Sequence, residues 1–268
     1  MIQLSALERL KTSLRDLIPP SATAATFVLC STAYSATITQ VQVTDDASSG
    51  ISSANTFTHA FDFGSTDSDA EAQTYTANGV PFTEVPSTIS TSATLTDATT
   101  NNTLVAAVAN GSTTVKGHPG NGSIVGLTDA VSDIYRDFAY VEAGVSDATL
   151  SFTVEGLVAG QTYSARFYGY GWEAATTDRR VTLSTDVDST TGTFNWNEYG
   201  LNSPFYLNAT YTAAGTSATF TMTLLDGENG PHMAAFTNQL LAVPEPRSAA
   251  LLAGGAGLLG MVRRRRLP

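Results

Sequence analysis

The chain has 268 residues, of which 14% are charged and 42% are hydrophobic, and its formal net charge is −11. The charged fraction lies below the roughly 25% of an average globular protein. Between Thr37 and Val243 the sequence has 5 basic and 21 acidic residues, a net charge of −16. Such a charge argues against nucleic acid and anionic lipid as partners, and a single cysteine, Cys30, excludes an internal disulfide.

The first segment predicts an export leader over residues 1–36. Basic residues including Lys11 and Arg15 precede a mildly apolar stretch from Ala22 to Ala33, and Ala33 to Ala36 supply the small residues that a signal peptidase needs. The alternative is an amphipathic N-terminal helix from Leu4 to Leu17.

Residues 37–242 are expected to form one all-β domain. Thr-rich segments with apolar alternation, separated by turn signals such as Asn78-Gly79, are typical of the short strands of a sandwich. The predicted strands are Ile38–Val43, Thr56–Phe63, Val80–Val85, Thr149–Glu155, Gln161–Tyr170, Arg180–Thr185, Ser217–Leu225 and Met233–Leu241. We therefore predict a single β-sandwich of the jelly-roll kind.

One segment breaks this pattern and predicts a short helix near residues 127–138. Its apolar residues recur every three or four positions, which is the period of an amphipathic helix. Thr128 is placed to cap its start, and the helix is expected to pack across an edge or mouth of the sandwich.

The segment from Asp147 to Glu173 contains a strand, a glycine turn, Tyr163 and a second strand. A tyrosine shortly after such a turn resembles the tyrosine corner of β-sandwich domains, in which the hydroxyl bonds to nearby backbone. The segment is also similar to galactose-binding-like and carbohydrate-binding jelly rolls. This resemblance implies a glycan-binding function.

Aromatic residues provide the candidate glycan-binding residues. Tyr168, Tyr170 and Trp172 share one face of a strand because side chains alternate, and Trp196 is a fourth candidate. An aromatic face offers apolar area to the axial C–H groups of a sugar ring. The alternative is that these residues belong to the sandwich core.

Asp67, Asp69 and Glu71 alternate in an acidic loop and are weak candidates for calcium, which favours loop carboxylates. They do not follow the spacing of a known calcium loop, so a solvated loop is the alternative. We expect no other cofactor.

No catalytic residues are predicted. The three histidines lack the spacing of a zinc site, and no nucleophile elbow occurs. Because glycosidase chemistry needs only two carboxylates, a polysaccharide-degrading enzyme remains a rival interpretation.

The last 26 residues have three parts. Pro244, Glu245 and Pro246 come first, an uncharged stretch from Ala249 to Val262 follows, and four basic residues come last: Arg263, Arg264, Arg265 and Arg266. As a helix the uncharged stretch would span about 21 Å, shorter than a bilayer core of about 30 Å, and the arginines would stay cytoplasmic.

This tail, residues 243–268, resembles the PEP-CTERM sorting signal of exopolysaccharide-producing bacteria. The resemblance implies recognition of Pro244-Glu245-Pro246 by a membrane-embedded exosortase, with the apolar stretch as a membrane segment and the arginines as a stop. An ordinary tail-anchored protein is the alternative.

Together these features predict a non-enzymatic bacterial protein that is exported through an inner-membrane intermediate to the cell surface or extracellular matrix. A structural or adhesive role beside exopolysaccharide is the main expectation, and a specific carbohydrate-binding module is the alternative. The expected partners are the exosortase and the membrane, both transiently, and extracellular polysaccharide.

Overall fold

The structure is a computed structural model, and it divides the chain into two units, Met1–Ala33 and Tyr34–Pro268. It describes residues 35–63, 75–85, 89, 91–110, 113–117, 124, 126–135, 137–141, 148–171, 174–225 and 232–242, all of which belong to the second unit. The predicted leader 1–36 lies outside the described residues as far as residue 34, whereas Ser35 is described and Ala36 begins the first strand. The tail 243–268, with its predicted apolar helix, also lies outside the described residues. No helix among the described residues has the length and apolar character needed to cross a membrane.

The described strands form two sheets. The larger sheet contains β1 (Ala36–Gln42), β2 (Thr56–Phe63), β3 (Tyr75–Ala77), β4 (Val80–Val85), β7 (Thr113–Gly117), β8 (Asp137–Val141), β10 (Thr162–Tyr170), β13 (Pro204–Thr212) and β15 (His232–Leu240). The smaller sheet contains β5 (Ser92–Thr96), β6 (Thr103–Ala109), β9 (Thr149–Glu155), β11 (Arg180–Thr185), β12 (Thr191–Asn195) and β14 (Ser217–Leu224). The predicted all-β sandwich is confirmed, and each of the eight predicted segments is a strand.

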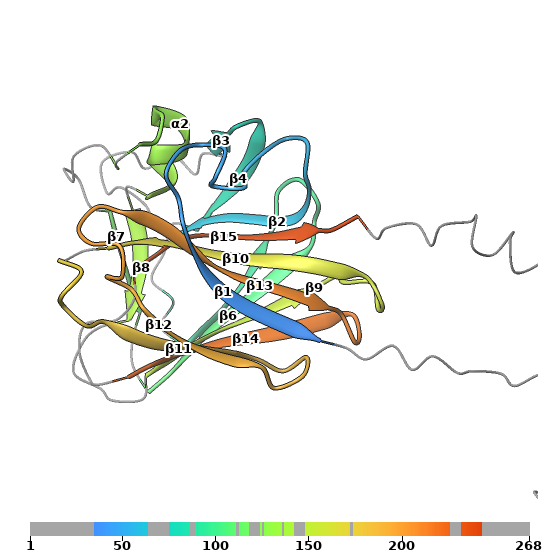
Figure 1. The fold of residues 1–268 in the computed structure, drawn as a ribbon. Coiled ribbons are helices and arrows are strands. Elements are labelled where there is room, and N and C mark those ends of the chain that lie inside the picture. The colour runs from blue at the N-terminus through green and yellow to red at the C-terminus, as the bar shows by residue number, and fades with distance from the viewer. Residues whose placement is uncertain are drawn as a thin grey trace, which may run out of the picture. The chain divides into compact units, whose positions relative to one another are not determined.

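The larger sheet has the order β1-β13-β10-β15-β2-β4-β3, and β8 pairs with both β15 and β7. The smaller sheet has the order β12-β11-β14-β9-β6-β5. In Figure 1 the strands β11, β12 and β14 of the smaller sheet run below β10 and β13 of the larger one, and no strand of one sheet is hydrogen-bonded into the described order of the other. Their described pairs are antiparallel except β2 and β4, which run parallel.

The core between the sheets is centred on phenylalanines. Phe167 of β10 lies 5.1 Å from Phe236 of β15 and 5.5 Å from Phe220 of β14, measured between ring centroids. Phe152 of β9 stacks on Phe236 at 6.1 Å. All four rings are buried, and each contributes about 1.5–3 kcal/mol through burial.

The outward side of the smaller sheet explains much of the threonine content. Thr219, Thr221 and Thr223 of β14 face Thr153, Ser151 and Thr149 of β9 in register. These residues are half-buried and alternate along their strands with buried apolar residues. Threonine and serine hydroxyls therefore make this face polar without adding charge. Threonine is also favoured in strands, which agrees with the all-β fold expected from the composition.

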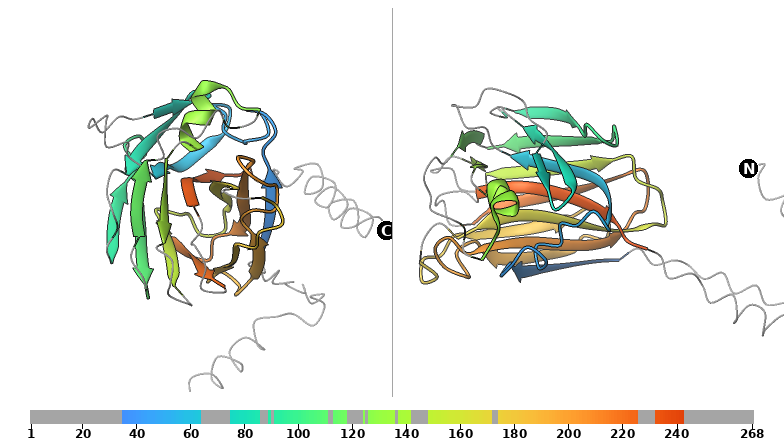
Figure 2. Two further views of the ribbon diagram at one scale, coloured as in Figure 1. Left: turned by 90° about the vertical axis from the view of Figure 1, so that its left-hand side faces the viewer. Right: turned by 90° about the horizontal axis from the view of Figure 1, so that it is seen from above.

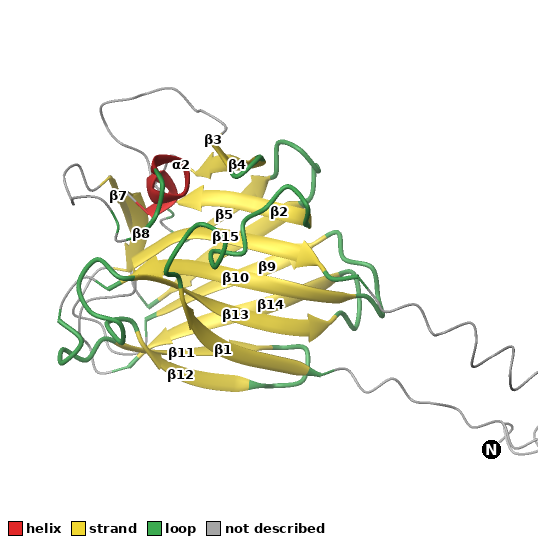
Figure 3. Ribbon diagram, turned by 45° about the horizontal axis from the view of Figure 1, so that its top comes forward, coloured by secondary structure: helices red, strands yellow, loops and turns green. Residues whose placement is uncertain are grey.

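A short helical stretch covers the outer face of the larger sheet. α2 (Asp129–Ser132) leads into the 3-10 turn η1 (Asp133–Tyr135), and the view from above in Figure 2 places α2 over the strands of this sheet. Figure 3 shows it in red beside β3 and β4. The predicted helix is confirmed in place but is shorter than residues 127–138, because β8 begins at Asp137.

The helical stretch contributes to a second hydrophobic cluster. Val131, Ile134 and Tyr135 are fully buried and pack with Tyr168 and Tyr170 on the outer face of β10. Thr128 stands directly before α2, where its carbonyl accepts the N–H groups of Val131 and Ser132, and its hydroxyl donates to the Asp46 carboxylate. Asp46 also accepts the backbone N–H of Thr128 at 2.9 Å, so this pair ties the helix to the loop after β1.

The predicted tyrosine corner is confirmed. The Tyr163 hydroxyl accepts the backbone N–H of Val158 at 2.9 Å, across the turn between β9 and β10. Gly160 in this turn has a φ of +82°, which glycine adopts without strain. The corner fixes where β10 enters the larger sheet.

Candidate functional site

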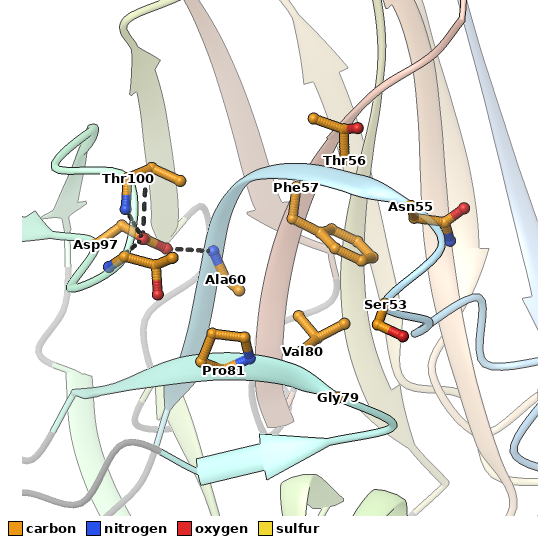
Figure 4. Close-up of a pocket in the computed structure, with 11 residues that line it drawn as sticks. Ser53, Asn55, Thr56, Phe57, Ala60, Gly79, Val80, Pro81, Asp97 and Thr100 are labelled. Atoms are coloured by element: carbon orange, nitrogen blue, oxygen red, sulfur yellow. Dashed lines mark hydrogen bonds between the residues drawn. The ribbon is translucent and has the colours of Figure 1, made fainter.

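A pocket of ≈ 310 Å³ lies where the larger and smaller sheets meet along β2 and β4. We call it the Phe57 pocket (Figure 4). Its walls come from three segments that are distant in the sequence: the loop into β2, the β3–β4 turn and the β5–β6 turn. The lining residues are Ser53, Asn55, Thr56, Phe57, Ala60, Gly79, Val80, Pro81, Asp97, Thr99 and Thr100.

Asp97 holds one wall of the Phe57 pocket in place. Its carboxylate is 2% exposed. Oδ1 accepts the backbone N–H groups of Thr99 at 2.9 Å and Thr100 at 2.8 Å, together with the Thr100 hydroxyl at 3.1 Å. This is the local turn that aspartate forms with backbone two and three residues ahead.

The same carboxylate joins the two sheets. Asp97 Oδ2 accepts the backbone N–H of Ala60 in β2 at 2.8 Å, as Figure 4 shows. The Thr100 hydroxyl, whose single proton is shared between two acceptors, lies nearer to the carbonyl of Thr58, at 2.7 Å, than to Asp97 Oδ1. The β5–β6 turn of the smaller sheet is therefore fixed against β2 of the larger one.

The opposite wall is fixed by backbone contacts around the β3–β4 turn. Asn78 and Gly79 both have positive φ, 48° and 76°, which is the conformation of a tight asparagine-glycine hairpin turn. Ser53 donates its N–H to the Asn78 carbonyl at 3.1 Å. Asn55 Nδ2 donates to the Gly50 carbonyl at 2.9 Å, so both walls are pre-formed.

The floor of the pocket is apolar. Val80 and Ala60 are buried, and Phe57 is half-buried, packed against the second hydrophobic cluster. In Figure 4 the Phe57 side chain lies in the middle of the lining residues, between Val80 and Thr56. Part of its ring is therefore available to a ligand.

The rim of the pocket is polar and uncharged. Ser53, Thr56 and Thr99 are exposed, and their hydroxyls make no hydrogen bond within the described part of the chain. Each hydroxyl can both donate and accept. The arrangement suits a neutral ligand with many hydroxyl groups and one apolar face.

His59 lies in β2 near the pocket but does not line it. The ring is fully buried, with Nε2 3.0 Å from the Thr103 carbonyl and Nδ1 3.0 Å from the Thr58 hydroxyl. Burial lowers the pKa of His59 from its ordinary value, against the opposing effect of the Thr103 carbonyl and Asp97. The ring is therefore a neutral, hydrogen-bonded core residue of β2.

The aromatic residues predicted to bind glycan are placed elsewhere. Tyr168 and Tyr170 do share one face of β10, as the alternation predicts, but both are 0% exposed under the helical stretch. The Tyr168 hydroxyl donates to the Ser49 carbonyl at 3.1 Å. These tyrosines are core residues, which corrects the stacking hypothesis in favour of its alternative.

Trp196 is also a core residue. It is 0% exposed, contacts Phe205 edge to face at 4.9 Å, and donates its indole N–H to the His232 carbonyl at 3.2 Å. It packs in the core between the sheets, whereas Tyr168 and Tyr170 belong to the outer cluster. The three residues therefore form no common surface.

Several predicted site residues lie outside the described residues. These are Trp172, the calcium candidates Asp67, Asp69 and Glu71, the motif Pro244-Glu245-Pro246 and the arginines 263–266. Within the described ranges, no group of three or more His, Cys, Asp or Glu side chains is arranged to hold a metal ion.

Four lining residues were not predicted from the sequence: Asn55, Phe57, Asp97 and Thr99. One signal was present: Asp97 is followed two and three residues later by threonines in a turn-rich segment, which is the pattern of a local aspartate turn. That pattern predicts a rigid turn. It does not predict which strand the turn contacts.

No family model and no curated protein sequence matches the chain. Among solved structures, a family 35 carbohydrate binding module from Clostridium thermocellum matches with 11% identity and a TM-score of 0.33, over 50% of this chain and 90% of that one. A family 35 module from an environmental isolate matches with 14% identity and a TM-score of 0.31, over 41% and 82%. An exo-beta-1,3-galactanase from Phanerochaete chrysosporium matches with 12% identity and a TM-score of 0.31, over 60% and 31%.

Proposed function

We propose that this chain is an exported bacterial surface protein whose β-sandwich binds a neutral glycan in the Phe57 pocket. The observation that carries the proposal is a half-buried phenylalanine ring surrounded by three exposed hydroxyls without hydrogen-bond partners. Such a site matches a sugar ring, which has an apolar C–H face and hydroxyls at its edge. The volume of ≈ 310 Å³ lies within the range of small-molecule pockets.

The burial and hydrogen bonding of Asp97 favour a binding function over a catalytic one. It is the one carboxylate among the described lining residues, and both of its oxygens accept hydrogen bonds from the protein. Glycoside hydrolysis uses two carboxylates that reach the scissile bond. A carboxylate that is 2% exposed and holds the wall of the pocket is not placed for that role.

Export and sorting rest on the sequence. The tail with Pro244-Glu245-Pro246, an uncharged stretch and four arginines supports recognition by an exosortase at the inner membrane and release to the cell surface or matrix. The net charge of −16 between Thr37 and Val243 favours neutral polysaccharide over nucleic acid or acidic polymer as the partner.

A glycan array tests the binding proposal. We expect the protein to bind neutral glycans, and Phe57→Ala to weaken that binding at least tenfold, because a buried phenylalanine contact contributes about 1.5–3 kcal/mol and each 1.4 kcal/mol is about tenfold. Phe194→Ala is the matched control, since Phe194 is half-buried in β12 of the other sheet. Absence of binding on the array would contradict glycan binding and indicate that the domain has a structural role.

Intact mass of the protein recovered from the native cell surface tests the sorting proposal. We expect a species that lacks the leader and the residues after the Pro244-Glu245-Pro246 region. Retention of Arg263 to Arg266 would instead indicate a simple membrane anchor.

A further inference from the structure

A second pocket adjoins the Phe57 pocket on the outer face of the larger sheet. It has a volume of ≈ 480 Å³, and we call it the Gln239 pocket. It shares Asn55 and Thr56 with the Phe57 pocket. Its other lining residues are Ala54, Gly160, Gln161, Gln239, Leu240, Leu241 and Ala242.

The two pockets are connected through one cross-strand pair. Gln239 of β15 is the register partner of Phe57 of β2, next to a β-bulge between Asn238 and Gln239. Register partners on neighbouring strands are close neighbours in space, and a bulge of this kind changes the direction in which a side chain points. Phe57 lines one pocket and Gln239 lines the other. A ligand that extends past the shared residues Asn55 and Thr56 would therefore contact both Phe57 and Gln239.

The Gln239 pocket contains polar groups that the protein leaves unbonded. The Oε1 atom of Gln239 is buried and has no hydrogen-bond partner. The side-chain amide of Gln161, a half-buried lining residue, makes no hydrogen bond within the described part of the chain. A buried acceptor without a partner destabilises the folded state. A turn of the Gln239 side chain, which lines the pocket, would bring Oε1 to a ligand hydroxyl and satisfy it.

Charge limits the class of ligand. The ionisable side chain among the described lining residues of the two pockets is Asp97, whose oxygens are already hydrogen-bonded. Arg166, on the same face of the sheet, donates to the Gly50 carbonyl at 3.1 Å and lies 5.5 Å from the Tyr206 ring centroid. Neither pocket is thus built around a cation that would recognise a uronate or a phosphate.

We infer that the two pockets are adjacent subsites for an uncharged linear oligosaccharide, with Gln239 Oε1 accepting a hydroxyl of the sugar unit beside the one on Phe57. This inference rests on the proposed function and specifies it further. The site recognises a stretch of polysaccharide chain rather than a single sugar, and Gln239 determines the gain in affinity from the second unit.

Titration calorimetry with fragments of increasing length tests this inference on the full chain. The probes are neutral gluco-, xylo-, manno- and galacto-oligosaccharides from mono- to tetrasaccharide, with uronate-containing fragments for comparison. We expect the disaccharide to bind at least about tenfold more tightly than the monosaccharide, with little gain beyond the disaccharide. Uronate-containing fragments are expected to bind more weakly than neutral ones.

Gln239→Met removes the acceptor and keeps the length of the side chain. We expect it to weaken disaccharide binding about five- to tenfold, as the loss of one hydrogen bond does, and to leave monosaccharide binding unchanged. Phe57→Ala should weaken both. Gln42→Met, an exposed glutamine of β1, is the matched control and should have no effect.

The outcomes separate the two proposals. Equal affinity for mono- and disaccharide, or an unchanged disaccharide affinity in Gln239→Met, overturns the two-subsite inference and leaves the Phe57 pocket as a site for a single sugar unit. Tightest binding of a uronate-containing fragment overturns the inference of a neutral ligand. Failure of every probe to bind overturns the proposed function together with this inference.

Discussion

Replacing Asp97 by alanine should destabilise the domain by about 2–6 kcal/mol. The buried N–H of Ala60, now bonded to Oδ2 at 2.8 Å, would lose its partner, which costs about 1–3 kcal/mol. The Thr99 and Thr100 amides, bonded at 2.9 and 2.8 Å, would lose about 0.5–1.5 kcal/mol each because water replaces the carboxylate incompletely.

Asp97→Asn provides a graded comparison. Its amide oxygen can still accept from Thr99 and Thr100, but its NH₂ group would face the Ala60 N–H, donor against donor. We therefore expect a smaller loss, about 1–3 kcal/mol. Asp178→Ala is the control, because Asp178 is exposed and accepts one long bond, 3.3 Å from Asn195 Nδ2; its effect should stay within about 0.5 kcal/mol.

Urea unfolding at neutral pH, followed by tryptophan fluorescence, measures these differences. The same variants should lose glycan binding in the order of their instability, since Asp97 holds the wall that carries Thr99. An Asp97→Ala protein within about 0.5 kcal/mol of the wild type would refute the reasoning, because the turn would then hold its place against β2 without the carboxylate.

Further predictions concern the corner, the core, the pH response and the leader. Tyr163→Phe should cost about 0.5–1.5 kcal/mol in urea unfolding, through the lost bond from Val158 N–H; no change would mean that the corner does not stabilise the turn. Gly169→Ala should cost about 1–3 kcal/mol or more, because a Cβ there would lie 2.4 Å from Trp196; a wild-type unfolding midpoint would contradict this packing. Burial lowers the folded pKa of His59 below 6.5, so the unfolded state binds more protons between the two pKa values and stability should fall as the pH drops below 6.5. His59→Asn should flatten that slope, and an unaltered slope would assign it to other groups. The Ser35 carbonyl accepts the Thr212 N–H at 3.2 Å and the Ala36 N–H donates to Asp188 at 2.7 Å. We therefore expect the leader to end before Ser35 and not at Ala36, and N-terminal peptide mapping of the exported protein to place its first residue at or before Ser35; a start at Thr37, as the predicted leader 1–36 implies, would contradict this.

The strands that alternate cleanly were predictable from the sequence. Thr149–Glu155 places buried Leu150, Phe152 and Val154 against half-buried threonine and serine, which is the period-two pattern of a half-buried strand. β13 was missed although it is nine residues long and lies between β1 and β10. It begins with Pro204, which a strand tolerates at its first position, and Asn208 interrupts its apolar residues.

Burial was less predictable than alternation. The sequence places Tyr168 and Tyr170 on one face of a strand, but it does not say what covers that face. The loop after β1 does so through Ser49, which accepts the Tyr168 hydroxyl, and the helical stretch does so through Tyr135, whose ring lies 6.2 Å from that of Tyr168. An aromatic strip that looked available for sugar is therefore core.

The Phe57 pocket was not predictable because it depends on long-range register. Ala60 and Asp97 are separated by 37 residues and meet through one hydrogen bond. The strands β2, β4 and β5 that surround the pocket are ordinary when read alone. The pocket exists only because the β5–β6 turn of one sheet docks on the other.

The measurement that tests the central claim most directly is amide NMR mapping of the purified protein titrated with the neutral oligosaccharide that binds most tightly on the array. The account predicts that the largest shift changes fall on Asn55, Phe57, Gly79 and Thr99, with smaller ones on Gln161 and Gln239. Shift changes that cluster away from the Phe57 and Gln239 pockets would contradict the assignment of the site.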